Sequence, residues 1–198
     1  MKKTLIWVGA LVILGLWIFR GYNGMLTSSE QVNQSWADVE TAYQARADKV
    51  KGLAAIVKNA AEFEQETLTD VIEARAKATS INISADELTP ENLAKFEAAQ
   101  NQLSGSLSRL MLTVERYPDL KAVQAYRDFQ HQYEGIENRI STARKDFNAK
   151  ATAYNIKIRR IPNVFISRML GFDKRPLFKS QEGSEYAPDV EGALDMDN

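Results

Sequence analysis

Side chains that could perform acid–base, nucleophilic or metal chemistry are sparse in this sequence of 198 residues. Its single histidine, His131, lies between two glutamines on a polar face of a helical pattern, where an isolated histidine is usually solvated. The glutamates at positions 62, 64 and 66 are two residues apart, so on a helix they diverge. Cysteine is absent, which excludes a thiol nucleophile, a thiolate metal site and a disulfide. We therefore predict no catalytic, cofactor-binding or metal-binding residues, no cofactor and no enzymatic activity.

Two polar residues interrupt otherwise apolar helical patterns. Arg46 and Gln100 each occupy a position where the spacing calls for an apolar side chain. One interpretation is that each side chain reaches solvent or is hydrogen-bonded and sets the register between helices. A sharper hypothesis pairs Arg46 with a carboxylate such as Glu137, later in the chain. Breaking a buried pair of this kind typically costs about 3 to 5 kcal/mol.

A second unusual segment is both basic and apolar. Residues 157–172 read KIRRIPNVFISRMLGF. Nucleic acid is a weak candidate for its ligand, because the sequence pI is about 6.0 and no recognition helix or stacking platform is visible. Three alternatives remain: the protein's own core, a lipid surface and a protein partner.

The alternatives for this segment use the same side chains differently. In the first interpretation the segment belongs to the core: Val164, Phe165, Met169 and Phe172 close the end of a bundle, while Arg159 and Arg160 are solvated. In the second interpretation, the segment is an interfacial amphipathic helix whose cations face anionic headgroups of a membrane. The candidate membrane or partner surface comprises Arg159, Arg160, Phe165, Arg168, Phe172, Lys174 and Arg175.

The N-terminal stretch predicts a helix that crosses a membrane. After Lys2 and Lys3 the chain is uncharged from residue 4 to residue 19. This run covers about 24 Å, and extending it past Arg20 makes up the roughly 30 Å of a hydrocarbon core. Trp7, Trp17 and Tyr22 fit the aromatic belts of the two interfaces. We predict a transmembrane helix at about residues 4–22, within an anchor that spans residues 1–26.

This anchor is expected to remain uncleaved. A signal peptide needs small residues before its cleavage site, and LWIFRGYNG, which ends the apolar run, offers no such pair. The two lysines and the amino terminus outweigh the lone Arg20, so the positive-inside tendency keeps the N-terminus cytoplasmic. The remaining chain would then lie outside a bacterial inner membrane, in the periplasm.

The body of the chain has the pattern of an all-α protein. Apolar residues recur every three or four positions along three stretches, at about 27–80, 90–117 and 120–158, and no useful β-type alternation occurs. Such stripes must bury against one another. We therefore expect an up-and-down bundle of three long antiparallel helices and a short C-terminal one, over residues 27–178. The acidic remainder, residues 179–198, is expected to be disordered.

Several helix boundaries can be placed from capping residues. Thr89 can cap a helix whose first residue is Pro90. Asn163 can cap the short helix, and Gly171 fits its C-terminal position.

Pro118 leaves two topologies open. If it marks a reversal, three helices run out, back and out, which places the 157–172 segment far from the membrane. If it only kinks a helix of about 70 residues, roughly 105 Å long, that helix returns the segment towards the membrane.

Several sequence blocks, in order over residues 22–178, resemble the LemA family. They include RADKV (46–50), EARAKA (73–78), ERYPDLKA (115–122), GIENRISTARKDFN (135–148) and RRIPN (159–163). The resemblance implies a membrane-anchored helical bundle, described in relatives as four helices, with no accepted enzymatic activity and no catalytic residues to transfer. Relatives include proteins implicated in bacterial membrane remodelling, among them magnetosome membranes, and others encoded near membrane proteases. One departure is Lys51-Gly52, where the family usually has Pro-Asn.

These observations lead to two functional hypotheses. The first is a non-enzymatic, membrane-anchored scaffold that self-assembles into homo-oligomers and serves membrane organisation or remodelling. The second is an adaptor or regulator of a membrane protease or another membrane protein complex. Membrane lipid is the expected partner of the N-terminal helix, a membrane protein is a possible partner, and nucleic acid is not expected.

Overall fold

The computed structural model describes residues 2–58 and 65–179, and within these ranges every regular element is helical. The prediction of an all-α fold, with an apolar N-terminal helix followed by a helical bundle, is confirmed. A short 3-10 turn at Ala85–Glu87 precedes α3. The helices are α1 (Lys2–Lys58), α2 (Gln65–Ser80), α3 (Pro90–Val114), α4 (Pro118–Ala122), α5 (Gln124–Arg159) and α6 (Asn163–Leu170).

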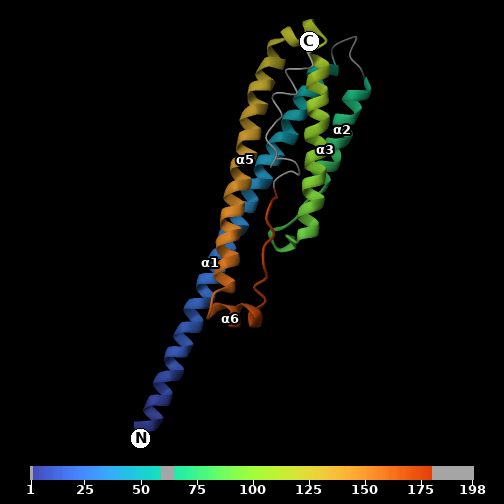
Figure 1. Ribbon diagram of the computed structural model, residues 1–198. Helices are drawn as coiled ribbons and strands as arrows, with labels where there is room; N and C mark the ends of the chain where they lie inside the picture. Colours follow the sequence, from blue (N-terminus) through green and yellow to red (C-terminus); the bar gives the residue numbers. More distant parts are fainter. Residues whose placement is uncertain (1, 59–64, 180–198) are drawn as a thin grey trace, which may run out of the picture.

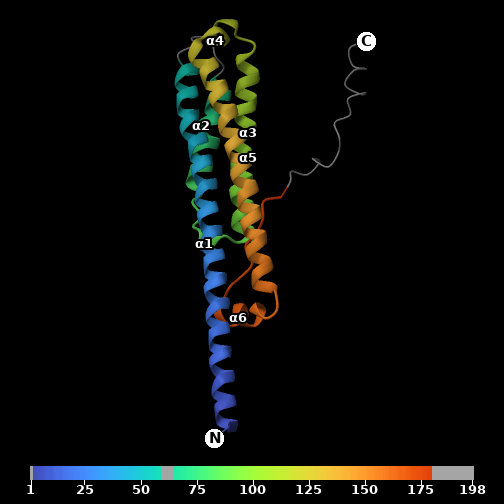
Figure 2. The ribbon, with the colours of Figure 1, turned by 90° about the vertical axis from the view of Figure 1, so that its left-hand side faces the viewer.

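The bundle makes four passes. α1 rises from the N-terminus, α2 returns beside it, α3 rises again and α5 descends along α1 (Figures 1 and 2). The expectation of one helix over residues 27–80 is therefore wrong. The apolar residues Val50 and Leu53 of α1 and Val71 of α2 belong to the same buried cluster. One straight helix would hold these side chains far apart along its axis, whereas two antiparallel helices bring them to one level.

The extra pass decides which end of the bundle carries residues 157–172. Pro118 starts α4 at the reversal between α3 and α5, so the reversal alternative is correct and the kink alternative is wrong. The inference that a reversal places residues 157–172 far from the N-terminal stretch is nevertheless wrong, because it assumed a bundle of three passes. With four passes α5 ends at the lower part of the bundle, and α6 lies there beside α1 (Figure 2).

α1 is a single helix of 57 residues that continues from the apolar N-terminal stretch into the bundle. That stretch is long and apolar enough to cross a membrane, and none of it is buried inside the described protein. Buried residues begin at Met25 and continue to Val57. The expected boundary between anchor and bundle at residue 26 thus lies inside one continuous helix, at the point where the surroundings of its side chains change. Lys51-Gly52 causes no break in this helix.

Aromatic side chains fill the lower half of the core. Trp36 packs edge-to-face on Phe96 and Phe147, with ring centroids 5.3 and 5.6 Å apart. Its indole N–H donates to the Ile83 carbonyl at 2.8 Å, which satisfies the polar atom of a side chain that is otherwise buried. Burying a large apolar side chain contributes about 1.5 to 3 kcal/mol, so this cluster is a major source of stability.

The predicted helix ends are mostly confirmed. The Thr89 hydroxyl accepts from the Asn92 backbone N–H at 3.1 Å, and Pro90 is the first residue of α3. Gly171 ends α6 in the left-handed region, with φ of 73°. Asn163 does not cap α6. It lies inside the helix, after Pro162, and its side chain donates to the Lys157 carbonyl at 3.2 Å.

Candidate functional site

α6 packs against α1 at the end of the apolar stretch. A Cβ atom at Gly21 would lie 2.9 Å from Ile166 Cδ1 and 3.3 Å from Asn163 Oδ1, so glycine permits this close approach. One residue further along α1, the Tyr22 ring meets Phe172 edge-to-face at 5.8 Å. The short helix therefore lies across the base of the bundle, just after the apolar stretch of α1 ends (Figure 1).

α6 buries one narrow side and exposes the other. Ile166 and Ser167 are buried, and the Ser167 hydroxyl donates to the Ile158 carbonyl at 2.9 Å. Phe165 and Met169 keep 67% and 70% of their surface exposed. The core alternative is thus wrong for these two residues, although Val164 and Phe172 are half-buried.

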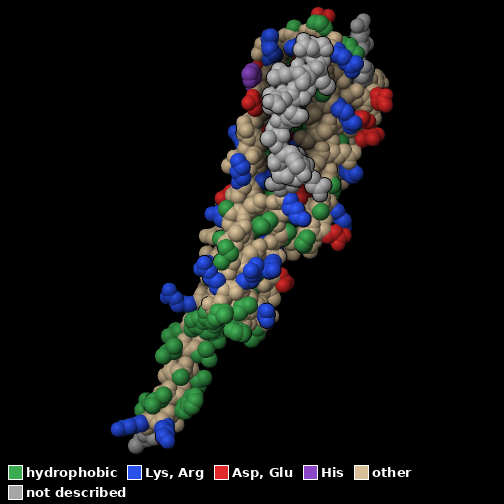
Figure 3. Space-filling view, in the orientation of Figure 1, with side chains coloured by type: hydrophobic (Ala, Val, Ile, Leu, Met, Phe, Trp, Pro, Cys, Tyr) green, Lys and Arg blue, Asp and Glu red, His purple; other side chains and the backbone are tan. Residues whose placement is uncertain are grey.

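We name the exposed part of this end the foot surface. Figure 3 shows apolar side chains gathered here, continuous with those of the N-terminal stretch, with Lys and Arg side chains beside them. Among the described residues, none of its four cations pairs with a carboxylate. The foot surface consists of Ile161, Phe165, Met169, Leu170 and the exposed cations Arg159, Arg160, Arg168 and Lys174.

Arg175 does not belong to the foot surface, contrary to our expectation. Its side chain is only 14% exposed and lies 3.8 Å from the Asp86 carboxylate. The guanidinium donates to the Ala85 carbonyl, to Ser29 Oγ at 3.4 Å and to Asn33 Oδ1 at 3.3 Å. Because the chain turns back along the bundle after Phe172, residue 175 already faces the protein.

Two asparagines of α5 hold the returning segment, residues 172–179, which we call the strap. Asn155 accepts from the Arg175 N–H at 2.9 Å and donates to the Arg175 carbonyl at 2.8 Å. Asn148 makes the same pair of bonds with Phe178, both at 2.9 Å. Seven residues of helix rise about 10.5 Å, and three residues of extended chain span about 10 Å. The separation of Asn148 and Asn155 on α5 therefore matches the separation of Phe178 and Arg175 on the strap. The sequence analysis does not predict this clamp, because two asparagines seven residues apart on a helix are not a distinctive pattern.

Phe178 inserts the end of the strap into the aromatic core. Its ring stacks on Trp36 at 6.1 Å and meets Phe147 edge-to-face at 5.5 Å. The Arg144 guanidinium lies 4.5 Å from the ring centroid and also bonds Glu97 at 2.9 Å. Burial raises the pKa of Glu97, while the Arg144 charge opposes that rise. The strap is therefore fastened to the core at its far end.

A lysine ties the lower end of α5 to α1. Lys157 Nζ donates to the Gly24 carbonyl at 3.0 Å and to the Ser28 hydroxyl. Together with the Gly21 contact and the strap, this bond holds α6 in one position relative to α1.

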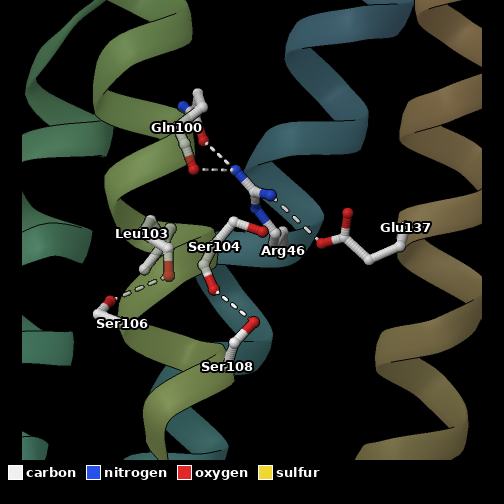
Figure 4. A network of polar contacts seen from close by, with 7 residues as sticks. All are labelled: Arg46, Gln100, Leu103, Ser104, Ser106, Ser108 and Glu137. Atoms are coloured by element: carbon white, nitrogen blue, oxygen red, sulfur yellow. Dashed lines mark hydrogen bonds and ion pairs between the residues drawn. The ribbon is translucent and has the colours of Figure 1, made fainter. Parts of the chain in front are cut away.

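The structure brings Arg46 and Glu137 together in the middle of the bundle. Arg46 is 3% exposed, and its Nη1 lies 3.2 Å from Glu137 Oε1 (Figure 4). Its Nη2 donates to the Gln100 side-chain oxygen at 2.7 Å and to the Gln100 carbonyl at 3.0 Å. Gln100 in turn donates to the Ala78 carbonyl at 3.3 Å. One arginine thus links α1 to α3 and α5, and through Gln100 to α2.

Two aromatic rings complete this buried network. The Arg46 guanidinium lies 4.9 Å from the centroid of the Tyr43 ring. Burial raises the pKa of Tyr133 to about 12, and the neighbouring Glu137 charge adds to the effect. The tyrosine is therefore neutral at any physiological pH, and the network carries one cation and one carboxylate.

No cluster of metal ligands is found among the residues that the structure describes. Over 2–58 and 65–179 no group of three or more His, Asp or Glu side chains is placed to hold a metal ion. His131 is an exposed residue of α5 and Glu66 an exposed residue at the start of α2. Glu62, Glu64 and residues 180–198 of the expected acidic tail lie outside the described ranges.

Comparisons with known proteins agree on one family. The model of the LemA family matches residues 35–191. The magnetosome proteins MamQ 2 and MamQ 1 of Paramagnetospirillum magneticum are each 25% identical over 181 residues, which is 83% of this chain and 66% of each relative. Protein LemA of Metamycoplasma hominis is 28% identical over 120 residues, 61% of this chain and 51% of the relative. The match therefore spans less than two thirds of the length of these relatives.

Proposed function

The chain belongs to the LemA family, and from this premise we propose that it is a non-enzymatic scaffold: a helical bundle anchored in the bacterial inner membrane that serves membrane organisation or remodelling. The similarity to proteins named as magnetosome proteins supports the link to membranes. The absence of catalytic motifs in the sequence supports a role through shape and contacts.

The observation that carries this proposal is the continuity of α1. Its first part is apolar and contributes no buried residue, and its second part is one of the four bundle helices that the structure describes. A helix of 57 residues is about 85 Å long. Because its backbone hydrogen bonds continue across the junction, the helix holds the bundle on the axis of the membrane span. The bundle is therefore a rigid extension of the membrane-spanning helix.

We place the bundle on the outer side of the membrane. Lys2 and Lys3 precede the apolar stretch and Arg20 follows it, so the positive-inside tendency keeps the N-terminus in the cytoplasm. The chain has no cysteine, so Leu112→Cys, an exposed site on α3, provides a unique label. We expect a membrane-impermeant maleimide to label this variant in intact spheroplasts. Labelling only after lysis would reverse the orientation.

The scaffold proposal includes self-assembly, and its test also examines the adaptor alternative. Large apolar side chains of the bundle helices that remain exposed, such as Ile72 of α2, offer contacts between copies. The full chain would be extracted from membranes in two mild detergents and its complex mass measured. We expect the same multiple of 22.3 kDa in both. A monodisperse monomer would overturn self-assembly, and a stoichiometric second protein would favour the adaptor.

A further inference from the structure

The foot surface lies at the depth where a membrane span must end. Gly21, on which α6 packs, is 17 residues beyond the start of the apolar run at Thr4. This separation corresponds to about 26 Å along the helix, compared with a hydrocarbon core of roughly 30 Å. A helix resting on Gly21 thus lies near the boundary between the hydrocarbon core and the headgroups, on the side where the chain leaves the membrane.

The apolar part of the foot surface continues the apolar surface of the span. Phe19, one helical turn before Tyr22, is largely exposed, and so are Phe165 and Met169 of α6. Ile161, in the turn before α6, is 80% exposed. Grouped apolar side chains of this kind mark an interaction surface. Because they adjoin a stretch that is itself suited to lipid, the occupant they fit is the same lipid.

The charged part of the foot surface selects the type of lipid. Arg159, Arg160, Arg168 and Lys174 are exposed, and Arg20 is exposed on the adjacent turn of α1. Asp173 is the one exposed carboxylate within the 157–175 segment that contains these four cations. Cations beside an apolar helix face are the pattern of an interfacial helix that binds anionic headgroups.

This surface is already formed without lipid. The Lys157 bond to Gly24, the close contact at Gly21 and the Asn155 clamp on Arg175 hold α6 against α1. A membrane contact therefore requires no helix folding at the interface, which removes an ordering cost that free amphipathic segments carry.

We infer that the foot surface is a second membrane contact, which inserts Phe165 and Met169 into the leaflet that α1 leaves and binds anionic phospholipid headgroups through the neighbouring arginines. The inference rests on the proposed membrane anchoring. It adds that the bundle is fixed to the membrane at two points, the span and α6, so that it cannot rotate or tilt freely about α1.

The absence of cysteine allows a depth measurement on the full chain. Single variants Phe165→Cys and Met169→Cys would carry a small fluorophore in reconstituted vesicles. The vesicles would contain phosphatidylcholine with or without an equal amount of phosphatidylglycerol, and lipids with a nitroxide high on the acyl chain. We expect strong quenching at both positions. Leu112→Cys is the matched control, because Leu112 has the same 70% exposure as Met169 but lies on α3, towards the other end of the bundle.

The outcomes separate this inference from the proposed anchoring. Leu11→Cys, within the apolar stretch, should be quenched by a nitroxide near the end of the acyl chain. If Leu11→Cys is quenched but Phe165→Cys is as unquenched as Leu112→Cys, the anchor stands and the second contact is wrong. If Leu11→Cys itself is unquenched, the anchoring has failed.

The role of the cations is tested by neutralising them. In the Phe165→Cys background we expect quenching to increase with phosphatidylglycerol and to decrease at high salt. Replacing Arg159, Arg160 and Arg168 together by Gln should remove this dependence on lipid charge. These side chains are exposed, so the variant should fold as before. Quenching that ignores lipid charge in the unmodified background would overturn the binding of anionic headgroups.

Discussion

Arginine has opposite surroundings in the middle of the bundle and at its lower end. Arg46 is 3% exposed and is surrounded by Glu137, Gln100 and Tyr43, so its charge is neutralised inside the protein. Arg159, Arg160 and Arg168 are exposed and leave their charge available. A buried charge is tolerated only with partners, whereas an exposed one can bind an external anion. The surroundings of a cation, and not its type, therefore decide whether its charge is neutralised inside this protein or stays available at the surface.

The largest expected effect comes from detaching the strap from the aromatic core. Phe178→Ala removes the ring that inserts into the aromatic core beside Trp36. Core Phe→Ala changes commonly cost about 3 to 5 kcal/mol, and we expect the lower end because a terminal segment can detach by itself. Hydrogen exchange should accelerate in the strap and α6, while α3 near Gln100 is unchanged. Uniform acceleration throughout the bundle would show that the foot and the network are not independent.

The buried network should be broken by removing its carboxylate. Glu137→Gln leaves Arg46 without a counter-charge, and we expect a loss of about 2 kcal/mol in the free energy of unfolding. This is less than the roughly 3 to 5 kcal/mol of a fully buried pair, because the Glu137 side chain is 35% exposed. Urea unfolding of the full chain in detergent, followed by circular dichroism, measures this loss. Adding Arg46→Met should recover part of the stability. If Glu137→Gln and Arg46→Met each leave stability unchanged, the pair is not structural.

A smaller change loosens the strap without opening the core. Asn155→Ala removes the two bonds to Arg175, at 2.9 and 2.8 Å. The strap is partly exposed and water can replace the asparagine, so we expect about 1 kcal/mol, seen as faster exchange of the Arg175 amide. Asn138→Ala is the matched control, because Asn138 is an exposed asparagine of the same helix. Equal exchange in the two variants would contradict the clamp.

The change with the smallest effect at neutral pH acts only under alkaline conditions. Burial raises the pKa of Tyr133 to about 12 from its ordinary value of 10.0. The folded state therefore holds this proton more tightly than the unfolded state does. The resulting stabilisation is complete below pH 10 and is lost as the pH rises through about 12. Tyr133→Phe should show a shallower loss of stability over that interval, and an identical pH profile would remove Tyr133 from the network.

Much of the network was accessible from sequence, and little of the strap was. Helical spacing placed Arg46 and Gln100 in apolar stripes. It offered Glu137 as one example of a carboxylate partner for Arg46, beside the alternative of a side chain that reaches solvent. The asparagines that hold the strap have no such signature, because an amide on a helix edge is ordinary. Their role depends on the strap, residues 172–179, which returns along the bundle. The sequence of α5 itself contains no pattern that indicates this contact.

The sequence by itself determined the elements of this protein: an apolar stretch fit to cross a membrane, all-α periodicity, the cap at Thr89 and the end of α6 at Gly171. These features depend on neighbours within a few residues, so the pattern contains them. Only the tertiary structure decided that α1 and α2 are separate passes, that α6 returns to Gly21, and that Arg175 faces inward while Phe165 faces out. The reason is that each of these outcomes depends on which apolar surfaces meet across the bundle, and such contacts join residues far apart in the chain.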